Sequence, residues 1–191
     1  MTKLLFKIIL IILISLGSKA EIKRISEGKI DANIKIIVYE SLTCSHCANF
    51  HKNVYPELKK EFIDNGKVFV EYRSFPLNLA ALNAAILAHC NNSGDTDILH
   101  FLFKNYENWV NGNTVDELNS NLKKLINEYN LNLDFDKCIG DKNLENFVLE
   151  DRIEGVRKFD VNATPTIIIN GKKFNKALTI INLREYLKKL I

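Results

Sequence analysis

The stretch Ile34-Lys35-Ile36-Ile37-Val38-Tyr39, separated by four residues from Cys44-Ser45-His46-Cys47, places a CxxC motif where a strand gives way to a helix. The first run is β-branched and aromatic, which predicts a buried strand. After the motif, apolar residues recur at helical spacing, and Thr43 stands in a plausible N-cap position. Cys44 then lies in the first helical turn, and the i, i+3 offset brings both sulfurs to one face, close enough to form a disulfide.

This position predicts the chemistry of the two thiols. A thiolate is the reactive form of cysteine, and the unpaired N–H groups at a helix N-terminus favour a negative charge there. His46, between the cysteines, can add a positive or hydrogen-bonding partner, so we expect the pKa of Cys44 to fall below the ~8.5 of a free thiol. A stabilised thiolate makes the disulfide a stronger oxidant. Cys44 is therefore the predicted attacking cysteine, and Cys47 the resolving one.

Other uses of a CxxC have to be weighed. A closed zinc site needs four ligands and usually a second cysteine pair, whereas the only close additional donors here are His46 and His51. The sequence favours a redox centre with no metal and no cofactor. A metal-binding carrier that uses Cys44, His46, Cys47 and His51, or an inert structural pair, are the alternatives.

The first twenty residues resemble an export signal. Lys3 and Lys7 flank a charged start that leads into an apolar run over 8–16, and small residues at Ser18 and Ala20 suit cleavage after Ala20. The alternative is an uncleaved anchor, but the apolar run is shorter than the ~20 residues that a spanning helix needs. No cysteine follows the cleavage point, which argues against a lipoprotein. Residues 1–20 are therefore the predicted signal peptide.

The charge balance excludes one class of partner. The chain of 191 residues has 26 Lys and Arg against 23 Asp and Glu, and the signal carries three lysines and no acid. The mature chain is left with 23 of each (26 − 3 = 23), so it lacks the basic surplus of a nucleic-acid-binding protein.

The predicted elements first alternate between strand and helix, and a series of helical segments follows. After a polar lead-in over 21–33, we expect a strand over 34–39, a helix over 44–64 bent by Pro56, and a strand over 67–73, which together form a parallel βαβ unit. Helical segments follow over 80–90, from 94 onward, after the capping box of Thr114 and Glu117, around 135–139 and over 142–158. The end of the chain predicts a strand over 163–169, an Asn170-Gly171 hairpin and a helix over 179–191.

The motif, this order of elements and Thr164-Pro165 together resemble the DsbA-like disulfide oxidoreductases of the thioredoxin superfamily. The stretch from Ser41 to His51, Phe75-Pro76-Leu77 and the segment around Thr164-Pro165 are similar to landmarks of that family. The resemblance implies an α/β thioredoxin fold over 31–76 and 150–191, with an all-helical domain inserted over 77–149.

The resemblance also implies a function. It predicts a periplasmic enzyme that introduces disulfide bonds into reduced exported proteins and is reoxidised by a membrane quinone-linked partner of the DsbB type. Pro165 is then a cis-proline facing the CxxC, and the backbone of Thr164 pairs with an extended substrate. A disulfide isomerase or reductase on the same fold is the alternative. Isomerases usually dimerise, and without an obvious dimerisation domain we expect a monomer.

Two departures from the family pattern concern the active site. Ser45 replaces the proline of the frequent Pro-His dipeptide, and Val38 stands where relatives often carry a buried acid. Glu40, two residues on, shares the strand face of Val38 if the strand extends that far. Either Glu40 assists deprotonation of Cys47, or it is a solvated surface acid.

The remaining two cysteines fall in the helical insertion. Cys90 and Cys138 are predicted to form a second disulfide, because leftover cysteines of an exported protein usually pair. His89 and His100 are expected to be packed or surface histidines rather than metal ligands.

Overall fold

A single five-stranded sheet organises the computed structural model, which describes residues 21–191. The predicted signal peptide lies outside the described residues. The strands run in the order β1-β3-β2-β4-β5, with bounds Ile25–Gly28 (β1), Ile34–Glu40 (β2), Val68–Ser74 (β3), Thr166–Ile169 (β4) and Lys172–Lys173 (β5). The central pair, β2 and β3, is parallel as predicted, whereas β1 and β4 are antiparallel to their neighbours.

Strand β1 corrects the expectation of a polar lead-in over 21–33. Ile25 to Gly28 pair with Tyr72 to Phe69 along the outer edge of β3. Only Ile25 in this strand is buried, so no hydrophobic alternation identifies it from sequence. Its backbone hydrogen bonds to β3 define it instead, and the strand brings Glu27 close to the core.

The predicted helix over 44–64 is divided into three segments. They are α1 (Ser45–Asn53), α2 (Tyr55–Leu58) and a π-helical turn, η1 (Lys59–Ile63). The break lies at Val54, and Pro56 sits in the first turn of α2, where its missing N–H costs no helical hydrogen bond. The bend predicted at Pro56 is therefore confirmed as a break just before it. Gly66, with a left-handed φ of +67°, follows the last turn.

The other predicted helices are present with shifted ends. Their bounds are Leu79–His89 (α3), Asp97–Lys104 (α4), Tyr106–Trp109 (α5), Val115–Glu128 (α6), Phe135–Ile139 (α7), Lys142–Phe159 (α8) and Ile180–Lys188 (α9). The capping box of Thr114 and Glu117 begins α6 as expected. No helix among residues 21–191 is both long and apolar enough to cross a membrane.

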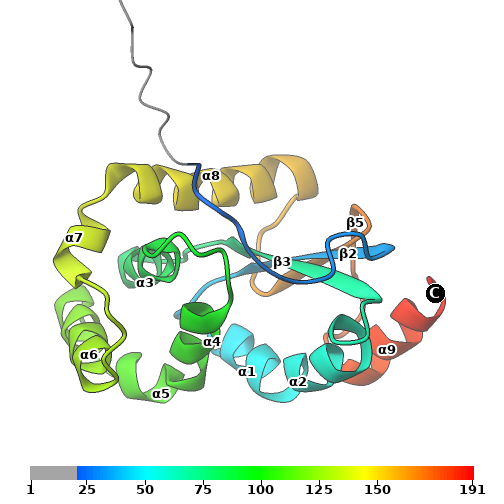
Figure 1. Cartoon of the computed structure of the whole chain (residues 1–191), viewed down its shortest axis with the longest axis horizontal. Helices are drawn as coiled ribbons and strands as arrows, with labels where there is room; N and C mark the ends of the chain where they lie inside the picture. Colours follow the sequence, from blue (N-terminus) through cyan, green and yellow to red (C-terminus); the bar gives the residue numbers. More distant parts are fainter. Residues whose placement is uncertain (1–20) are drawn as a thin grey trace, which may run out of the picture.

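The helices form two layers and a separate group. Figure 1 shows α8 along one side of the sheet, α1, α2 and α9 along the other, and α3 to α7 gathered toward one end. This is the predicted thioredoxin fold with a helical insertion. The insertion begins between β3 and α3, near the predicted residue 77, whereas residue 150 falls inside the continuous helix α8, so the exact division stays a prediction.

Alternation along β2 divides the interior into two cores. Ile34, Ile36 and Val38 face the larger core, together with Phe50 of α1. Tyr39 faces the smaller core on the opposite side of the sheet. There Gly155 of α8 lies so close that a Cβ at this position would come within 2.8 Å of the Tyr39 ring, so α8 can approach the sheet only with glycine at this point. Glu40, in phase with Val38, therefore belongs to the α1 side of the sheet.

A disulfide joins the end of α3 to α7 within the insertion. Cys90 follows α3 and Cys138 lies in α7, and the structure bonds their sulfurs as predicted. The bond closes a loop with a sequence separation of 48 residues. Closing so long a loop restricts the unfolded chain far more than the folded one.

The Cys44→Ser/Cys47→Ser double variant is expected to contain no reactive thiol. Breaking the bond in this background, with Cys90→Ala and Cys138→Ala, should lower the free energy of unfolding by up to roughly 4 kcal/mol, because the loop-closure entropy returns to the unfolded chain. Thiol counting under denaturing conditions and urea unfolding measure the two effects. Two titratable thiols in the double variant would contradict the pairing.

Candidate active site

Cys44 is the N-cap of α1 rather than a residue of its first turn. Its N–H donates to the carbonyl of Ser41 at 3.0 Å, and its own carbonyl accepts the N–H of Ala48 at 3.0 Å. The prediction that Thr43 caps the helix is therefore wrong, because the turn that Cys44 closes with Ser41 moves the helix start one residue on. The sulfur of Cys44 consequently lies at the open end of α1, where backbone N–H groups have no helical acceptor.

The loop before Cys44 is held by the helical insertion. The amide of Asn78 donates to the Thr43 hydroxyl at 3.1 Å, and the Tyr106 hydroxyl donates to the Thr43 carbonyl at 3.1 Å. Asn78 is itself the N-cap of α3, where its side chain accepts from Ala81. Sequence reasoning did not identify these contacts, because they depend on how the insertion docks.

The surroundings of Cys44 stabilise its thiolate. A hydrogen bond from the Cys47 thiol is the largest influence, and with Thr164 and the backbone amides of His46 and Cys47 it outweighs burial and lowers the pKa of Cys44 to about 5. As a thiol, Cys44 donates to the Thr164 carbonyl at 3.4 Å. The buried Thr164 hydroxyl has no other hydrogen-bond partner in the described chain, so it is available to donate to the thiolate.

Cys47 has the opposite character. Its side chain is fully buried (0% exposed), whereas Cys44 is 9% exposed at the helix end. Burial, the neighbouring Cys44 and the negative charge of Glu40 all raise the pKa of the Cys47 thiol. One sulfur is thus ionised and reachable, and the other is protonated and enclosed, as predicted for an attacking and a resolving cysteine.

The predicted cis-proline is present beside the cysteines. Thr164 and Pro165 are joined by a cis peptide bond just before β4, and the Thr164 carbonyl reaches Cys44. His46 contributes differently from the expectation. Its side chain is exposed, and its backbone N–H, rather than its imidazole, is what lowers the pKa of Cys44.

Glu40 is buried, so the interpretation as a solvated surface acid is wrong. Its side chain is 3% exposed, and its Oε2 lies 2.7 Å from Nε2 of His51, a residue of α1 that is equally enclosed. Its other oxygen, Oε1, is buried without a hydrogen-bond partner among the described residues. The burial is tolerated because the imidazole supplies a hydrogen bond to the carboxylate.

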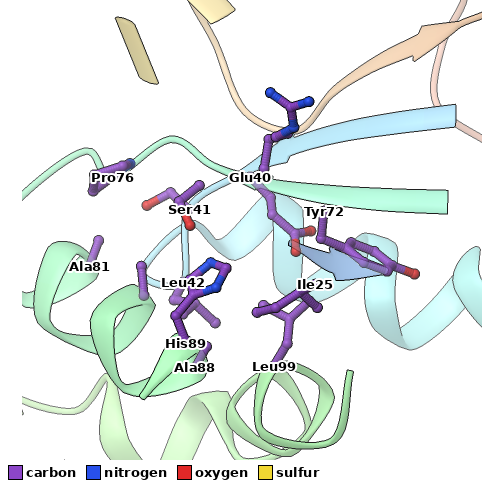
Figure 2. A pocket seen from close by; sticks show the side chains of 13 residues that line it. Ile25, Glu40, Ser41, Leu42, Tyr72, Pro76, Ala81, Ala88, His89 and Leu99 are labelled. Atoms are coloured by element: carbon purple, nitrogen blue, oxygen red, sulfur yellow. The ribbon is translucent and has the colours of Figure 1, made fainter. Parts of the chain in front are cut away.

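A small cavity lies next to Glu40. It measures about 10 Å³, room for at most one water molecule, and both Glu40 and His89 line it (Figure 2). Burial lowers the pKa of His89 to about 4, so this imidazole is neutral, and its Nε2 has no hydrogen-bond partner within residues 21–191. His89 is thus packed, as expected.

The polar contacts continue from His51 into the insertion. Nδ1 of His51 lies 3.2 Å from Nδ1 of His100, a residue of α4. Nε2 of His100 lies 3.4 Å from Oε1 of Glu27 in β1. Glu27 also accepts hydrogen bonds from the Tyr72 hydroxyl at 2.6 Å and from Lys59 at 3.0 Å. The structure therefore assembles a row of acid and imidazole groups from four separate elements.

These contacts bear on the metal alternative. Both ring nitrogens of His51 are engaged, one by Glu40 and one by His100, so His51 does not present a free donor toward the cysteines. Within residues 21–191, no three His, Cys, Asp or Glu side chains are arranged to hold a metal ion.

Comparisons with known proteins agree with this geometry. The sequence matches a family described as Thioredoxin over residues 20–189. Among solved structures, alpha-DsbA1 of Wolbachia pipientis is 31% identical with a TM-score of 0.78, covering 87% of this chain and 90% of that one. BdbD of Bacillus subtilis is 20% identical with a TM-score of 0.67, covering 87% and 92%, and shows the fold alone.

A curated relative from Rickettsia bellii carries the name of a protein-disulfide oxidoreductase. It is 28% identical over 150 residues, which are 75% of this chain and 56% of that protein. The chain therefore spans little more than half of this relative, and matches 36% of its Rickettsia conorii counterpart.

A pH titration of the reduced protein, monitored through the ultraviolet absorbance of the thiolate, is expected to show one step near pH 5. This step should be absent from Cys44→Ser. Cys47→Ala should move this step to higher pH, because it removes the hydrogen bond that contributes most to lowering the pKa of Cys44. An unshifted step in Cys47→Ala would contradict this assignment.

The same pKa shift predicts how the stability of the reduced form depends on pH. Because the pKa of Cys44 is lower in the folded than in the unfolded chain, its ionisation stabilises the reduced fold fully above the unfolded value near 9. The contribution declines as the pH falls and is gone below about 5. Urea unfolding of reduced wild type and Cys44→Ser across this range measures it.

Proposed function

The chain belongs to the DsbA-like proteins of the thioredoxin superfamily, and on this premise we propose that it is a thiol-disulfide oxidoreductase that oxidises the thiols of exported proteins. The observation that carries the proposal is the contrast between its two cysteines. The pKa of Cys44 is lowered at the open end of α1, and the pKa of Cys47 is raised in the core.

The proposed reaction transfers two electrons from substrate to enzyme. A substrate thiolate attacks the sulfur of Cys44, the S–S bond to Cys47 breaks, and Cys47 departs with the electron pair and takes up a proton. A second substrate thiolate then attacks the substrate sulfur of the mixed disulfide. Cys44 leaves as a thiolate, and its lowered pKa makes it a good leaving group. The substrate now holds the disulfide, and the enzyme is reduced.

The oxidising direction is supported by the same electrostatics. Interactions that stabilise the Cys44 thiolate exist in the reduced enzyme and are lost when the disulfide forms. They therefore favour the reduced state of the enzyme, which makes its disulfide a strong electron acceptor. An exchange protein whose thiolate was not stabilised would lack this driving force.

The substrate is proposed to be an extended segment of a reduced protein. The backbone of Thr164 lies beside Cys44 and precedes β4, so it can pair with a substrate strand while the substrate thiol faces the Cys44 sulfur. The export signal predicted over 1–20 supports action in the periplasm. Reoxidation by a membrane partner of the DsbB type completes the proposed cycle.

A Cys47→Ser variant is expected to accumulate mixed disulfides with reduced client proteins, because the resolving thiol that would release them is missing. Cys44→Ser should accumulate none, since Cys47 is fully buried. Non-reducing electrophoresis after acid trapping measures both. If Cys44→Ser traps clients and Cys47→Ser does not, the assigned roles are reversed.

Equilibration of the Cys44–Cys47 pair with glutathione buffers is expected to give a disulfide more oxidising than that of glutathione. The oxidase should form disulfides in a reduced unfolded protein faster than it rearranges scrambled ones. Rapid rearrangement by a dimer would favour the isomerase alternative. If the Cys44–Cys47 pair has a reduction potential as low as that of a stable structural disulfide, the result would contradict both the oxidase and the isomerase functions.

A further inference from the structure

We propose that the cavity beside Glu40 is a binding site for one water molecule, which bridges the carboxylate of Glu40 and the imidazole of His89. Glu40 is the last residue of β2, and His89 is the last residue of α3. The water therefore joins the strand that precedes the active site to the helical insertion. The site is argued from unpaired buried atoms, so it does not depend on the proposed exchange reaction.

Two buried polar atoms without a protein partner identify the site. They are Oε1 of Glu40 and Nε2 of His89, and neither has a hydrogen-bond partner within residues 21–191. Both residues line the same cavity, and Figure 2 shows the His89 ring and the Glu40 carboxylate beside it. A buried polar atom that makes no hydrogen bond is costly, and a buried water is the usual partner where the protein supplies none.

The imidazole of His89 presents an acceptor to this cavity. Burial lowers the pKa of His89 to about 4, so the ring is neutral and carries a single N–H. A hydrogen bond to the Lys23 backbone opposes this shift by favouring the protonated ring, which means that the ring donates to the Lys23 carbonyl. Because Nε2 has no partner, the donor is Nδ1, and Nε2 keeps its lone pair.

Glu40 also presents an acceptor. Its Oε2 accepts from Nε2 of His51 at 2.7 Å, and its negative charge acts on Cys47. A carboxylate has only acceptor atoms, so Oε1 and Nε2 of His89 cannot hydrogen bond to each other. Their shared partner has to supply two donors, which a water molecule does with its two O–H groups.

The size and the walls of the cavity agree with this ligand. Its volume of about 10 Å³ is roughly the space of one water molecule. Tyr72 and Arg73 also line it, but hydrogen bonds to acidic side chains engage both. The Ser41 hydroxyl, another lining group, accepts the Leu77 N–H at 3.4 Å, and its own proton is available to the oxygen of the water.

The water gives the buried carboxylate its second hydrogen bond. His51 engages Oε2 and the water engages Oε1, so both oxygens of Glu40 are paired. Burial and the neighbouring Cys44 raise the pKa of the Cys47 thiol most, and the charge of Glu40 adds to their effect. His89 is therefore a positioning residue, because through the water it stabilises a charge that acts on the resolving cysteine.

Nitrogen-15 NMR of the imidazole rings in the oxidised protein at pH 7 tests the direction of the hydrogen bonds. His89 is expected as the tautomer with its proton on Nδ1, and its signal is assigned by its loss from His89→Gln. A proton on Nε2, or a doubly protonated ring, would overturn the proposal, because the imidazole could then donate to Glu40 without a water.

A crystal structure of the oxidised wild type locates the water directly. A peak is expected within about 2.6–3.2 Å of both Oε1 of Glu40 and Nε2 of His89. An empty cavity, a direct contact between the two side chains, or a peak bonded to only one of them would refute the bridge. None of these results bears on thiol exchange at Cys44, so the proposed function stands or falls separately.

Two variants of similar length and shape test whether His89 holds the water. Both His89→Gln and His89→Met lose the donor to Lys23, but only Gln offers an acceptor near the position of Nε2. Crystal structures are expected to show the water in His89→Gln and to lack it in His89→Met. An equally ordered water in both would show that His89 is not its partner. The wild-type measurements decide the proposal if either variant does not fold.

Discussion

A carboxylate buried at the end of the central strand is the constraint around which the active centre is arranged. Glu40 continues the alternation of β2 into the apolar core, where an unpaired charge would cost several kcal/mol. His51 of α1 supplies its hydrogen-bond partner, His100 of α4 meets His51, and Glu27 of β1 stands next to His100. Each of these groups comes from a different element, so the row of contacts that begins at Glu40 joins the end of β2 to α1, α4 and β1.

The same arrangement explains how two identical side chains three residues apart acquire opposite properties. Cys44 ends the non-helical segment, and its sulfur meets the backbone N–H groups that the start of α1 leaves unpaired. Cys47 lies one turn deeper, against the core and toward the Glu40 charge. The hydrogen bond between the sulfurs adds to the difference, because the proton that Cys47 retains stabilises the anion on Cys44. The enclosed acid thus supports the reactivity of a thiol that it does not touch.

The sequence was informative where a local pattern has one physical solution. The CxxC at a strand–helix junction, the capping box at Thr114, the hairpin at Asn170-Gly171 and the kink near Pro56 all follow from short-range sterics or hydrogen bonding. The resemblance to a family, rather than local pattern, predicted the cis bond before Pro165. Strand β1 was not predicted, because backbone pairing with the edge of β3 forms it and its sequence shows no hydrophobic alternation. The contacts of His100 escaped for a related reason: they join segments far apart in sequence, and nothing near His100 indicates which acid it will meet.

The helical insertion is consequently part of the reactive centre and not only a cover for it. Asn78 and Tyr106 hold Thr43, the residue before the attacking cysteine, while His100 contacts His51, the partner of the buried Glu40. The loop before Cys44 and the buried Glu40–His51 pair therefore both depend on the position of the same group of helices. A displacement of the insertion by even about 1 Å would lengthen these hydrogen bonds beyond their useful range. Docking of the insertion thus sets the position of the loop before the attacking cysteine and of the imidazole that meets His51, and the disulfide between α3 and α7 restrains the insertion.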